Sequence, residues 1–336
     1  MKKILSVCIP TYNMEALLSR CLDSFIIEQN LMEQLEIIVV NDGSKDSSSK
    51  IAHEYAEKYP GTYIVVDKTN GNYGSCINAA LKIATGKYFR ICDADDRYDS
   101  TALSKYVDEL QKTNADLTIT PFVERNYNDV ERYRQIMDQD INGKLFKIED
   151  IRWTEWKYLQ FRAMHCLAVK THLLVDNHYK QLEGISYTDT QFVFFSTLYS
   201  NTCVFLDLPL YHYYLGRDGQ TMSKESMARC NLHFYKNAKA MLDKYVTLPK
   251  DMPENKRYLI FNSITVAMGY FSNLILLEMK HTSEQQALLR DAIKTSKESK
   301  LYCPLEEVLS ESKYFKYWYR YHVPQSLIYT IHHRLH

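Results

Sequence analysis

Three aspartates follow an apolar segment within four positions and could hold a metal ion. Asp93, Asp95 and Asp96 come directly after Tyr88 to Cys92, a run that is typical of a buried strand. Carboxylates this close raise one another's pKa and destabilise the fold unless something positive binds among them. Hard oxygen ligands suit Mg²⁺ or Mn²⁺, which keep coordination positions open for substrate phosphates. The cluster therefore predicts a divalent metal held against a diphosphate, where it would neutralise charge on a leaving group.

Two more polar clusters occupy matching points in the chain. One runs from Thr11 to Asn13 and the other from Asn41 to Ser44, and each follows an apolar strand-like segment. Each cluster alone is explained by a turn or a helix cap, and capping remains the alternative for Asp96 and Asp99. Three clusters at corresponding positions favour a shared ligand site.

The elements that must position these clusters follow from the spacing of apolar residues. Short β-branched runs alternate with segments of helical period, which implies an α/β fold whose mostly parallel sheet is flanked by helices. In such sheets the ligand lies at the carboxyl ends of the strands. The predicted strands cover residues 3–9, 35–40, 63–66, 88–92 and 117–120, and the predicted helices cover 14–28, 46–59, a stretch ending at 84, and 100–113.

Composition excludes several classes of protein. The 336 residues carry 41 Lys plus Arg and 41 Asp plus Glu, and this balance argues against nucleic-acid binding as the main function. Eight cysteines are scattered without a CxxC pair, so zinc knuckles and a disulfide framework are not expected and a reducing, cytoplasmic location fits best. The first ten residues are too short an apolar run for a signal peptide. Residues 258–277 lack charge over the length of a membrane span, but polar side chains at helical spacing favour a buried helix.

Four blocks closely resemble the nucleotide-sugar-binding half of family 2 glycosyltransferases, in that family's order, over about residues 4–120. They are Val7-Cys8-Ile9-Pro10-Thr11-Tyr12-Asn13, Ile37-Ile38-Val39-Val40-Asn41-Asp42-Gly43-Ser44, Asn72-Tyr73-Gly74 with Asn78, and Gly86-Lys87-Tyr88 with Asp93-Ala94-Asp95-Asp96.

The resemblance implies a GT-A fold, with a Rossmann-like sheet, that transfers a sugar from a nucleoside diphosphate sugar, most often a UDP-sugar. Asp42 would accept hydrogen bonds from the base. Asp93 would contact the donor and the metal, and Asp95 is the stronger candidate for direct metal ligation. Ile77 replaces an arginine that the family often has before the residue matching Asn78. The remaining donor-binding positions implied are Pro10, Thr11, Tyr12, Asn72, Gly74 and Asn78.

The second half resembles the family's acceptor segments. An inverting transfer needs a base that takes the proton of the acceptor hydroxyl, and Asp189 matches that base, with helix capping as the alternative. Thr188 stands where the family usually has Glu. Arg217 would meet the diphosphate and Thr221 would add a hydroxyl contact. His212 could complete the metal shell, although a histidine in an aromatic strand is more often packed.

The expected organisation is a catalytic domain over 1–221, divided into a donor half (1–120) and an acceptor half (121–221), and a C-terminal α-helical extension over 222–336. Residues 313–336 mix aromatic rings with cations and contain no acidic residue. This mixture suits peripheral contact with the inner face of the cell membrane; docking on the protein itself or on another subunit is the alternative. Trp153 and Trp156 could stack on acceptor sugars, and core packing explains them equally well.

The leading hypothesis is an inverting, metal-dependent glycosyltransferase that acts on a glycan, a lipid-linked glycan or a surface polysaccharide. A nucleotidyltransferase is the second reading, but it would normally show a Gly-rich phosphate loop near the N-terminus, and Pro10 to Asn13 is not one. A non-catalytic nucleotide-sugar-binding scaffold is the third hypothesis. The presence of Asp189 and Arg217 argues against it. A homo-oligomer is left open.

Overall fold

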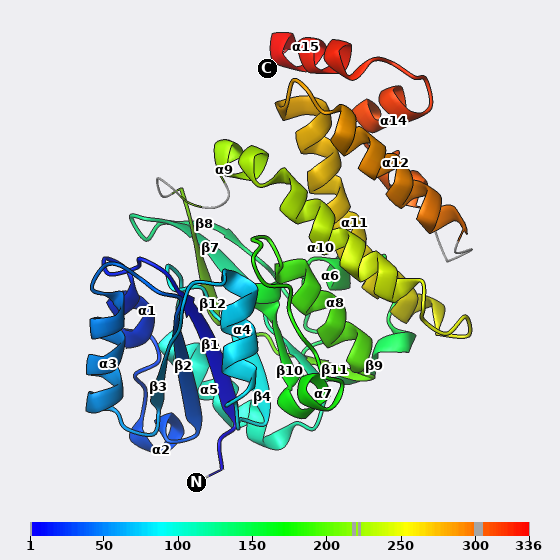
Figure 1. The fold of residues 1–336 in the computed structure, drawn as a ribbon. Coiled ribbons are helices and arrows are strands. Elements are labelled where there is room, and N and C mark those ends of the chain that lie inside the picture. The colour runs from blue at the N-terminus through cyan, green and yellow to red at the C-terminus, as the bar shows by residue number, and fades with distance from the viewer. Residues whose placement is uncertain (1, 217–219, 221–222, 299–304, 336) are drawn as a thin grey trace. The chain divides into compact units, whose positions relative to one another are not determined.

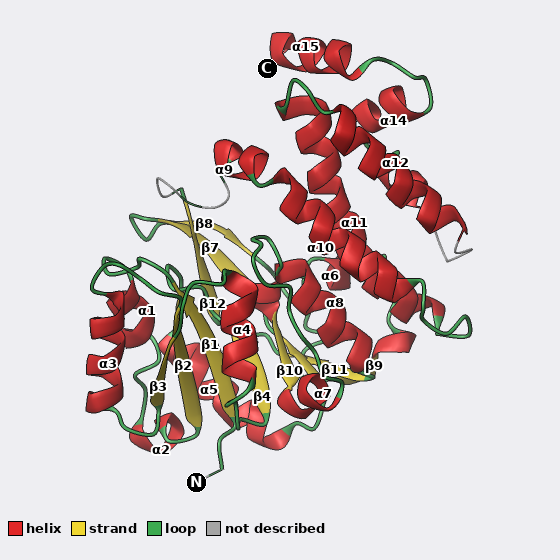
Figure 2. Cartoon of the chain, viewed as in Figure 1, coloured by secondary structure: helices red, strands yellow, loops and turns green. Residues whose placement is uncertain are grey.

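The computed structural model describes residues 2–216, 220, 223–298 and 305–335. The chain divides into two compact units. Unit 1 comprises Met1–Ile185 and Phe195–Arg217, and unit 2 comprises Ser186–Phe194 and Asp218–His336. The described strands all belong to unit 1, and the part of unit 2 that the structure describes is helical (Figures 1 and 2).

The main sheet of unit 1 has eight strands in the order β3-β2-β1-β4-β10-β6-β11-β9. The first four strands in this order are mutually parallel, as the alternation of strands and helices predicts. Beyond β4 the sheet becomes mixed, because β10 is antiparallel to both β4 and β6. The bounds are β1 Leu5–Thr11, β2 Leu35–Asn41, β3 Tyr63–Asp67, β4 Tyr88–Ile91, β6 Leu117–Ile119, β9 Leu145–Lys147, β10 Leu167–Lys170 and β11 Thr202–Phe205.

A smaller sheet has the strand order β5-β12-β7-β8. Its β12 pairs antiparallel with β5 and parallel with β7. This sheet matters for the site because β5 begins directly after the aspartate cluster. The bounds are β5 Arg97–Tyr98, β7 Phe122–Asn126, β8 Glu131–Arg134 and β12 Tyr211–Leu215.

The helices of unit 1 follow the predicted segments, with one clear difference. The stretch expected to form a single helix over 14–28 forms only the short α1, and α2 follows after a break. The apolar residues of this stretch, such as Leu22 and Phe25, are nevertheless fully buried in the core. The bounds are α1 Leu18–Asp23, α2 Gln29–Met32, α3 Ser48–Lys58, α4 Tyr73–Leu81, α5 Ser100–Lys112, α6 Trp156–Leu159 and α7 Thr171–Asp176, with 3₁₀ turns η1 Ile148–Asp150 and η2 Met164–Cys166. α8, Asp189–Tyr199, begins in unit 2 and ends in unit 1.

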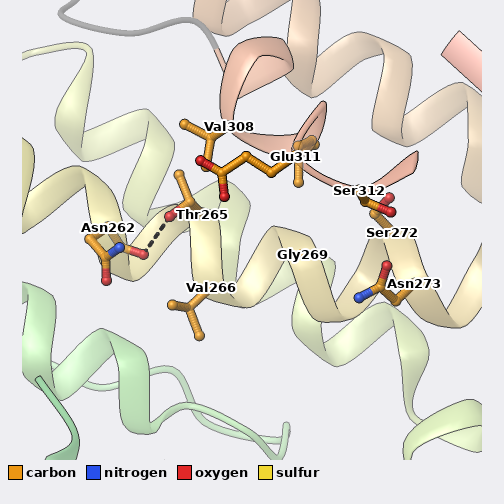
Figure 3. A pocket seen from close by; sticks show the side chains of 10 residues that line it. Asn262, Thr265, Val266, Gly269, Ser272, Asn273, Val308, Glu311 and Ser312 are labelled. Carbon is orange, nitrogen blue, oxygen red and sulfur yellow. Dashed lines mark hydrogen bonds between the residues drawn. The ribbon is translucent and has the colours of Figure 1, made fainter. Parts of the chain in front are cut away.

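Unit 2 is built around α11 and its π-helical continuation η3. The combined helix is long and apolar enough to cross a membrane, but 72% of its most apolar window is buried inside the protein. One side of α11 lines a hollow of about 250 Å³, in which the Thr265 hydroxyl donates to the Asn262 carbonyl at 2.8 Å (Figure 3). These observations agree with the interior helix expected from the polar spacing. The bounds are α9 Lys224–Arg229, α10 Asn231–Tyr245, α11 Glu254–Asn273, η3 Leu274–Glu278, α12 Ser283–Glu298, α13 Leu305–Leu309, α14 Lys313–Tyr319 and α15 Gln325–Leu335.

Candidate functional site

Three polar loops leave the main sheet at one edge. β1 lies between β2 and β4 and is parallel to both, with Thr11 opposite Asn41 and Cys8 opposite Ile91. The residues that follow β1, β2 and β4 therefore emerge side by side at the carboxyl ends of adjacent strands. This is the place where open α/β sheets bind ligands.

Asp42 is held rigidly at the end of β2. Its side chain is almost fully buried, and its Oδ1 accepts hydrogen bonds from the Lys68 ammonium at 2.6 Å and the Gly71 amide at 2.9 Å. The Ser75 hydroxyl approaches the same oxygen at 3.4 Å. All three bonds end on Oδ1, so they do not use the acceptor capacity of Oδ2.

Lys68 is a residue of this site that the sequence analysis missed. It follows β3, and besides Asp42 it donates to the Thr69 carbonyl at 2.6 Å and the Ser75 hydroxyl at 2.8 Å. The signal was present, because Asp67 to Asn70 is a polar run directly after the third parallel strand. Applying the strand-end argument to β3, as to its neighbours, would have found it.

The loop after β1 is fastened to the loop after β2. The Asn13 side chain accepts from the Lys45 amide at 2.8 Å, and the Asn13 amide donates to the Ser44 hydroxyl at 3.1 Å. Thr11 is buried and donates to the Ile9 carbonyl at 3.1 Å, so its hydroxyl is used inside the protein. Tyr12 is 46% exposed, and its ring is open to a ligand.

Asn72, Gly74 and Asn78 lie at or in α4, and the last two hold a distant segment of unit 1. The Asn78 amide group donates to the Gln181 carbonyl at 2.9 Å and to a Glu183 carboxylate oxygen at 2.8 Å, while its oxygen accepts from the Gln181 amide at 2.8 Å. Asn72 precedes the helix at a φ of 65°, which Asn tolerates better than most residues. Asn78 thus binds the segment at Gln181 to Glu183, which precedes Asp189 in the chain.

Substituting Gly74 tests how tightly this segment is packed. A Cβ at Gly74 would lie 1.9 Å from the Leu182 carbonyl oxygen, far inside contact distance. We expect Gly74→Ala to lower the stability of unit 1 by about 1–3 kcal/mol, as overpacking usually does. Thermal unfolding followed by circular dichroism measures this. Gly269→Ala is the control, because a Cβ there meets nothing within 4 Å; equal melting temperatures for both variants would refute the packing argument.

The aspartate cluster divides into two half-exposed carboxylates and one buried one. Asp93 and Asp95 are partly exposed, and Asp93 accepts a hydrogen bond from the Tyr73 hydroxyl at 2.7 Å. Asp96 is 1% exposed and accepts from the Tyr211 hydroxyl at 2.6 Å and the Tyr214 amide at 2.7 Å. Asp96 therefore anchors β12 and is not the surface helix cap considered from the sequence. The cap is Asp99, whose side chain accepts from the Ala102 amide of α5 at 2.8 Å.

Negative charge accumulates at this strand end. Burial is the main cause that raises the pKa of Asp96 well above its usual value, and repulsion from Asp95 and Asp93 adds to it. Arg90 does not offset this charge, since it is fully buried and donates to the Thr120 hydroxyl at 2.9 Å and to the His165 carbonyl.

Two other arginines stand near the cluster. Arg97 is paired with Asp129 at 2.9 Å. Arg20 of α1 donates to the Asp95 carbonyl oxygen at 2.6 Å, and its guanidinium lies 4.0 Å from the centre of the Tyr214 ring. Arg20 is not predicted from the sequence, because nothing in its helical context indicates that it would reach the cluster.

The described residues supply two of the expected metal ligands at the strand end but no third. Within the described ranges, no three His, Cys, Asp or Glu side chains are grouped so as to hold a metal ion. His212, on β12, is buried, and burial together with the charges of Arg125 and Arg97 lowers its pKa to about 4, so the ring is neutral. Asp93 and Asp95 nevertheless fit Mg²⁺ or Mn²⁺, which need few protein carboxylates when phosphates complete the shell.

Asp189 lies in unit 2, at the first position of α8. The preceding turn is fixed by Asn237 of α10, which donates to the Tyr187 carbonyl and to the Thr190 hydroxyl, both at 2.8 Å. The Tyr187 ring stacks on that of Phe234 at 4.2 Å between centres. Asp189 is an exposed residue, yet desolvation by the surrounding protein raises the pKa of its carboxyl.

The remaining predicted site residues are two donor contacts and two tryptophans. Arg217 and Thr221 lie outside the described residues. Trp153 is 2% exposed and donates to the Ile148 carbonyl at 3.0 Å, so core packing is correct for it and stacking on an acceptor is wrong. Trp156 is 67% exposed and remains open to a ligand.

Sequence comparisons identify relatives of this chain. The sequence model described as Glycosyl transferase family 2 matches residues 6–176. A poly(ribitol-phosphate) beta-glucosyltransferase of Bacillus spizizenii is 38% identical over 117 residues, which cover 34% of this chain and 18% of the relative. The chain thus matches well under two thirds of that relative's length.

Structural comparisons extend over nearly the whole chain. The crystal structure of S. aureus TarS 1-349 in complex with UDP-GlcNAc matches with a TM-score of 0.60 and 19% identity, covering 95% of this chain and 92% of that one. The mannosyltransferase PcManGT from Pyrobaculum calidifontis, in complex with GDP-Man and Mn²⁺, matches with a TM-score of 0.52 and 17% identity, covering 94% and 85%. At these identities the likeness concerns the fold.

Proposed function

The chain belongs to glycosyl transferase family 2, and from this we propose that it is an inverting, metal-dependent enzyme that moves a sugar from a UDP-sugar to a hydroxyl of a cell-surface glycan. The GT-A fold predicted from the sequence is confirmed. The observation that carries the proposal is the meeting of the loops after β1, β2 and β4 at one edge of a parallel sheet. Tyr12, Asp42 and the pair Asp93 and Asp95 come from those three loops.

We propose that the base of the donor is recognised by Asp42. Lys68 and Gly71 fix the carboxylate through Oδ1, and Oδ2 would accept the N–H of a uracil ring. Tyr12 would lie against the nucleoside, with Pro10 and Thr11 shaping the loop beneath it. Asn72, Gly74 and Asn78 would shape the pocket indirectly, since Asn78 positions the segment at Gln181.

Asp93 and Asp95 would hold the divalent metal. When bound, Mg²⁺ or Mn²⁺ neutralises the charge that develops on the departing diphosphate. Asp93 is oriented by the Tyr73 hydroxyl, and the backbone of Asp95 is fastened by Arg20. His212 is neutral and so in a form able to ligate, but within the described residues it is not grouped with Asp93 and Asp95 around one metal position.

We propose Asp189 as the base that takes the proton of the acceptor hydroxyl. Its pKa is raised by desolvation, and a base acts best when its pKa approaches the working pH. Arg217 and Thr221 stay proposed contacts to the donor diphosphate on sequence grounds.

The acceptor is proposed to be a glycan, a lipid-linked glycan or a wall polysaccharide, in a cytoplasmic reaction. Support comes from the relative named poly(ribitol-phosphate) beta-glucosyltransferase and from another named minor teichoic acid biosynthesis protein, both of the genus Bacillus. The scattered cysteines suit a reducing compartment.

Asp42→Asn tests the proposed recognition of the base. An amide would present an N–H where the carboxylate accepts, and we expect the affinity for UDP to fall roughly ten- to a hundredfold, the range for a hydrogen bond to a charged group. Isothermal titration calorimetry with Mn²⁺ measures this, and circular dichroism checks the fold. Asp108→Asn on the exposed side of α5 is the matched control. An unchanged affinity in Asp42→Asn would remove Asp42 from the donor site.

A further inference from the structure

Helix α14, which is rich in aromatic residues, has a buried side and an exposed side. Phe315 and Trp318 are buried. The Trp318 ring N–H donates to the Gln286 side chain at 2.9 Å, and the Arg290 guanidinium lies 4.2 Å from the ring centre. Trp318 therefore fastens α14 to α12, and packing within the protein explains both rings.

The next helix, α15, is fastened in the same way by one side. The Gln325 side chain is buried and donates to the Ile275 carbonyl at 3.1 Å and the Met279 carbonyl at 2.7 Å. Carbonyls at the end of a helix lack partners within that helix, so Gln325 caps the end of η3. Ile328 is 2% exposed and packs on the same side. The positions of both helices in unit 2 are thus set by buried contacts.

The opposite side of α14 carries exposed rings and cations at helical spacing. Lys313 and Tyr317 are exposed and lie one turn apart on α14, and Arg320 and Tyr321, directly after the helix, are exposed as well. Tyr317 is 46% and Tyr321 65% exposed, and their ring centres are 6.2 Å apart.

The exposed side of α15 repeats this composition. Leu327, Ile331 and Arg334 recur at i, i+4 and i+7, and the two aliphatic residues are 50% and 42% exposed. The rings of Tyr314 and His332 meet edge to face at 5.6 Å, which joins the two helices. We define the terminal face as the following exposed residues: Lys313, Tyr317, Arg320, Tyr321, Leu327, Ile331 and Arg334.

The charge of the terminal face is positive. Its cations are Lys313, Arg320 and Arg334, and residues 312–336 contain no Asp or Glu. Acidic groups do approach from elsewhere: Glu306 of α13 lies 3.7 Å from Arg320, and Glu278 of η3 lies 3.7 Å from His332. The Lys313 ammonium stands 4.9 Å from the centre of the Tyr314 ring.

We propose that the terminal face binds the surface of an anionic lipid bilayer, which goes beyond the transfer reaction proposed above. Tyrosine rings and aliphatic side chains enter the boundary between headgroups and acyl chains, while cations meet anionic headgroups. A nucleic acid would use the cations but would leave Leu327 and Ile331 without a partner. A second copy docked face to face would set cation against cation.

Vesicle co-sedimentation of the full chain tests this proposal. We expect the protein to sediment with vesicles of phosphatidylglycerol and phosphatidylcholine, to stay in solution with phosphatidylcholine alone, and to be released by high salt. Tyr317→Ser with Tyr321→Ser should abolish sedimentation. Lys313→Gln with Arg334→Gln should lower the partition coefficient by roughly fivefold for each charge removed.

Lys244→Gln with Lys250→Gln is the matched control, because it removes two exposed cations of unit 2 that lie outside the terminal face. It should sediment as the unchanged protein does. Circular dichroism shows whether each variant is folded, and UDP affinity should be equal in all of them, so failure of this proposal is separable from failure of the proposed function.

Four outcomes would overturn the proposal. They are no sedimentation with anionic vesicles, equal sedimentation with neutral ones, terminal-face variants that sediment normally, and a dimer in analytical ultracentrifugation that the tyrosine substitutions dissociate. The last result would assign the face to a second copy of the chain.

Discussion

Replacing Asp189 with Asn is expected to lower the turnover of sugar transfer by about a hundredfold or more while leaving nucleotide affinity unchanged. The amide has nearly the same shape as the carboxylate but cannot take the proton of an acceptor hydroxyl. The turn before α8 should persist, because Asn237 holds the Tyr187 carbonyl and the Thr190 hydroxyl rather than the Asp189 side chain. The effect should therefore be chemical and not structural.

The measurement pairs single-turnover transfer of radiolabelled sugar with calorimetric titration of UDP. Asp243→Asn is the matched control, since Asp243 is an exposed carboxylate of the same unit, paired with Lys239 at 2.6 Å on the surface of α10. Unchanged turnover in Asp189→Asn would remove Asp189 from the role of base. Equal losses of turnover and of UDP affinity would assign it to donor binding.

The pH dependence of transfer gives a second test of the same residue. Desolvation by the surrounding protein raises the pKa of Asp189 above that of a free aspartate, so its carboxyl takes up a proton at a higher pH than a fully hydrated one does. The basic form is lost as the pH falls through this raised pKa. The acid limb of kcat/KM should accordingly lie above the ordinary range of Asp, and it should be absent from the residual activity of Asp189→Asn.

The location of the site could be predicted from sequence because the signals are local. A buried parallel strand is a short β-branched run, and the residues after it are read directly from the chain. This reasoning places Asp42 and Asp93 at strand ends, and the structure shows that β1, β2 and β4 are neighbours. The same reasoning would have included Lys68 after β3.

What the sequence could not show depends on contacts between distant residues. The antiparallel β10 inserts between β4 and β6, although it follows them in the chain. The sequence of a short strand does not indicate which strands it pairs with. Arg20 reaches a carbonyl 75 positions away. Trp153 and Trp156 are three residues apart, yet one is buried and the other exposed. Burial of a lone aromatic depends on which elements cover it.

Asp95→Ala is the second substitution with a large expected effect: the affinity for UDP should no longer depend on Mn²⁺. The substitution removes one of the two carboxylates proposed to hold the metal and leaves the backbone carbonyl that accepts from Arg20. It also removes a charge that helps to raise the pKa of Asp96, so repulsion at the buried anchor of β12 should decrease. We therefore expect a folded protein that binds UDP weakly and equally with Mn²⁺ or EDTA.

Thermal shift and calorimetry with UDP, each run with Mn²⁺ and with EDTA, measure this effect, because a ligand that binds the native state raises its melting temperature. Asp108→Ala, an exposed substitution on α5, should behave as the unchanged protein. If the unchanged protein bound UDP equally well in EDTA, the strand-end carboxylates would have no metal to hold. Arg20, whose guanidinium already contacts the Asp95 backbone, would then be a candidate to offset the charge of Asp93 and Asp95.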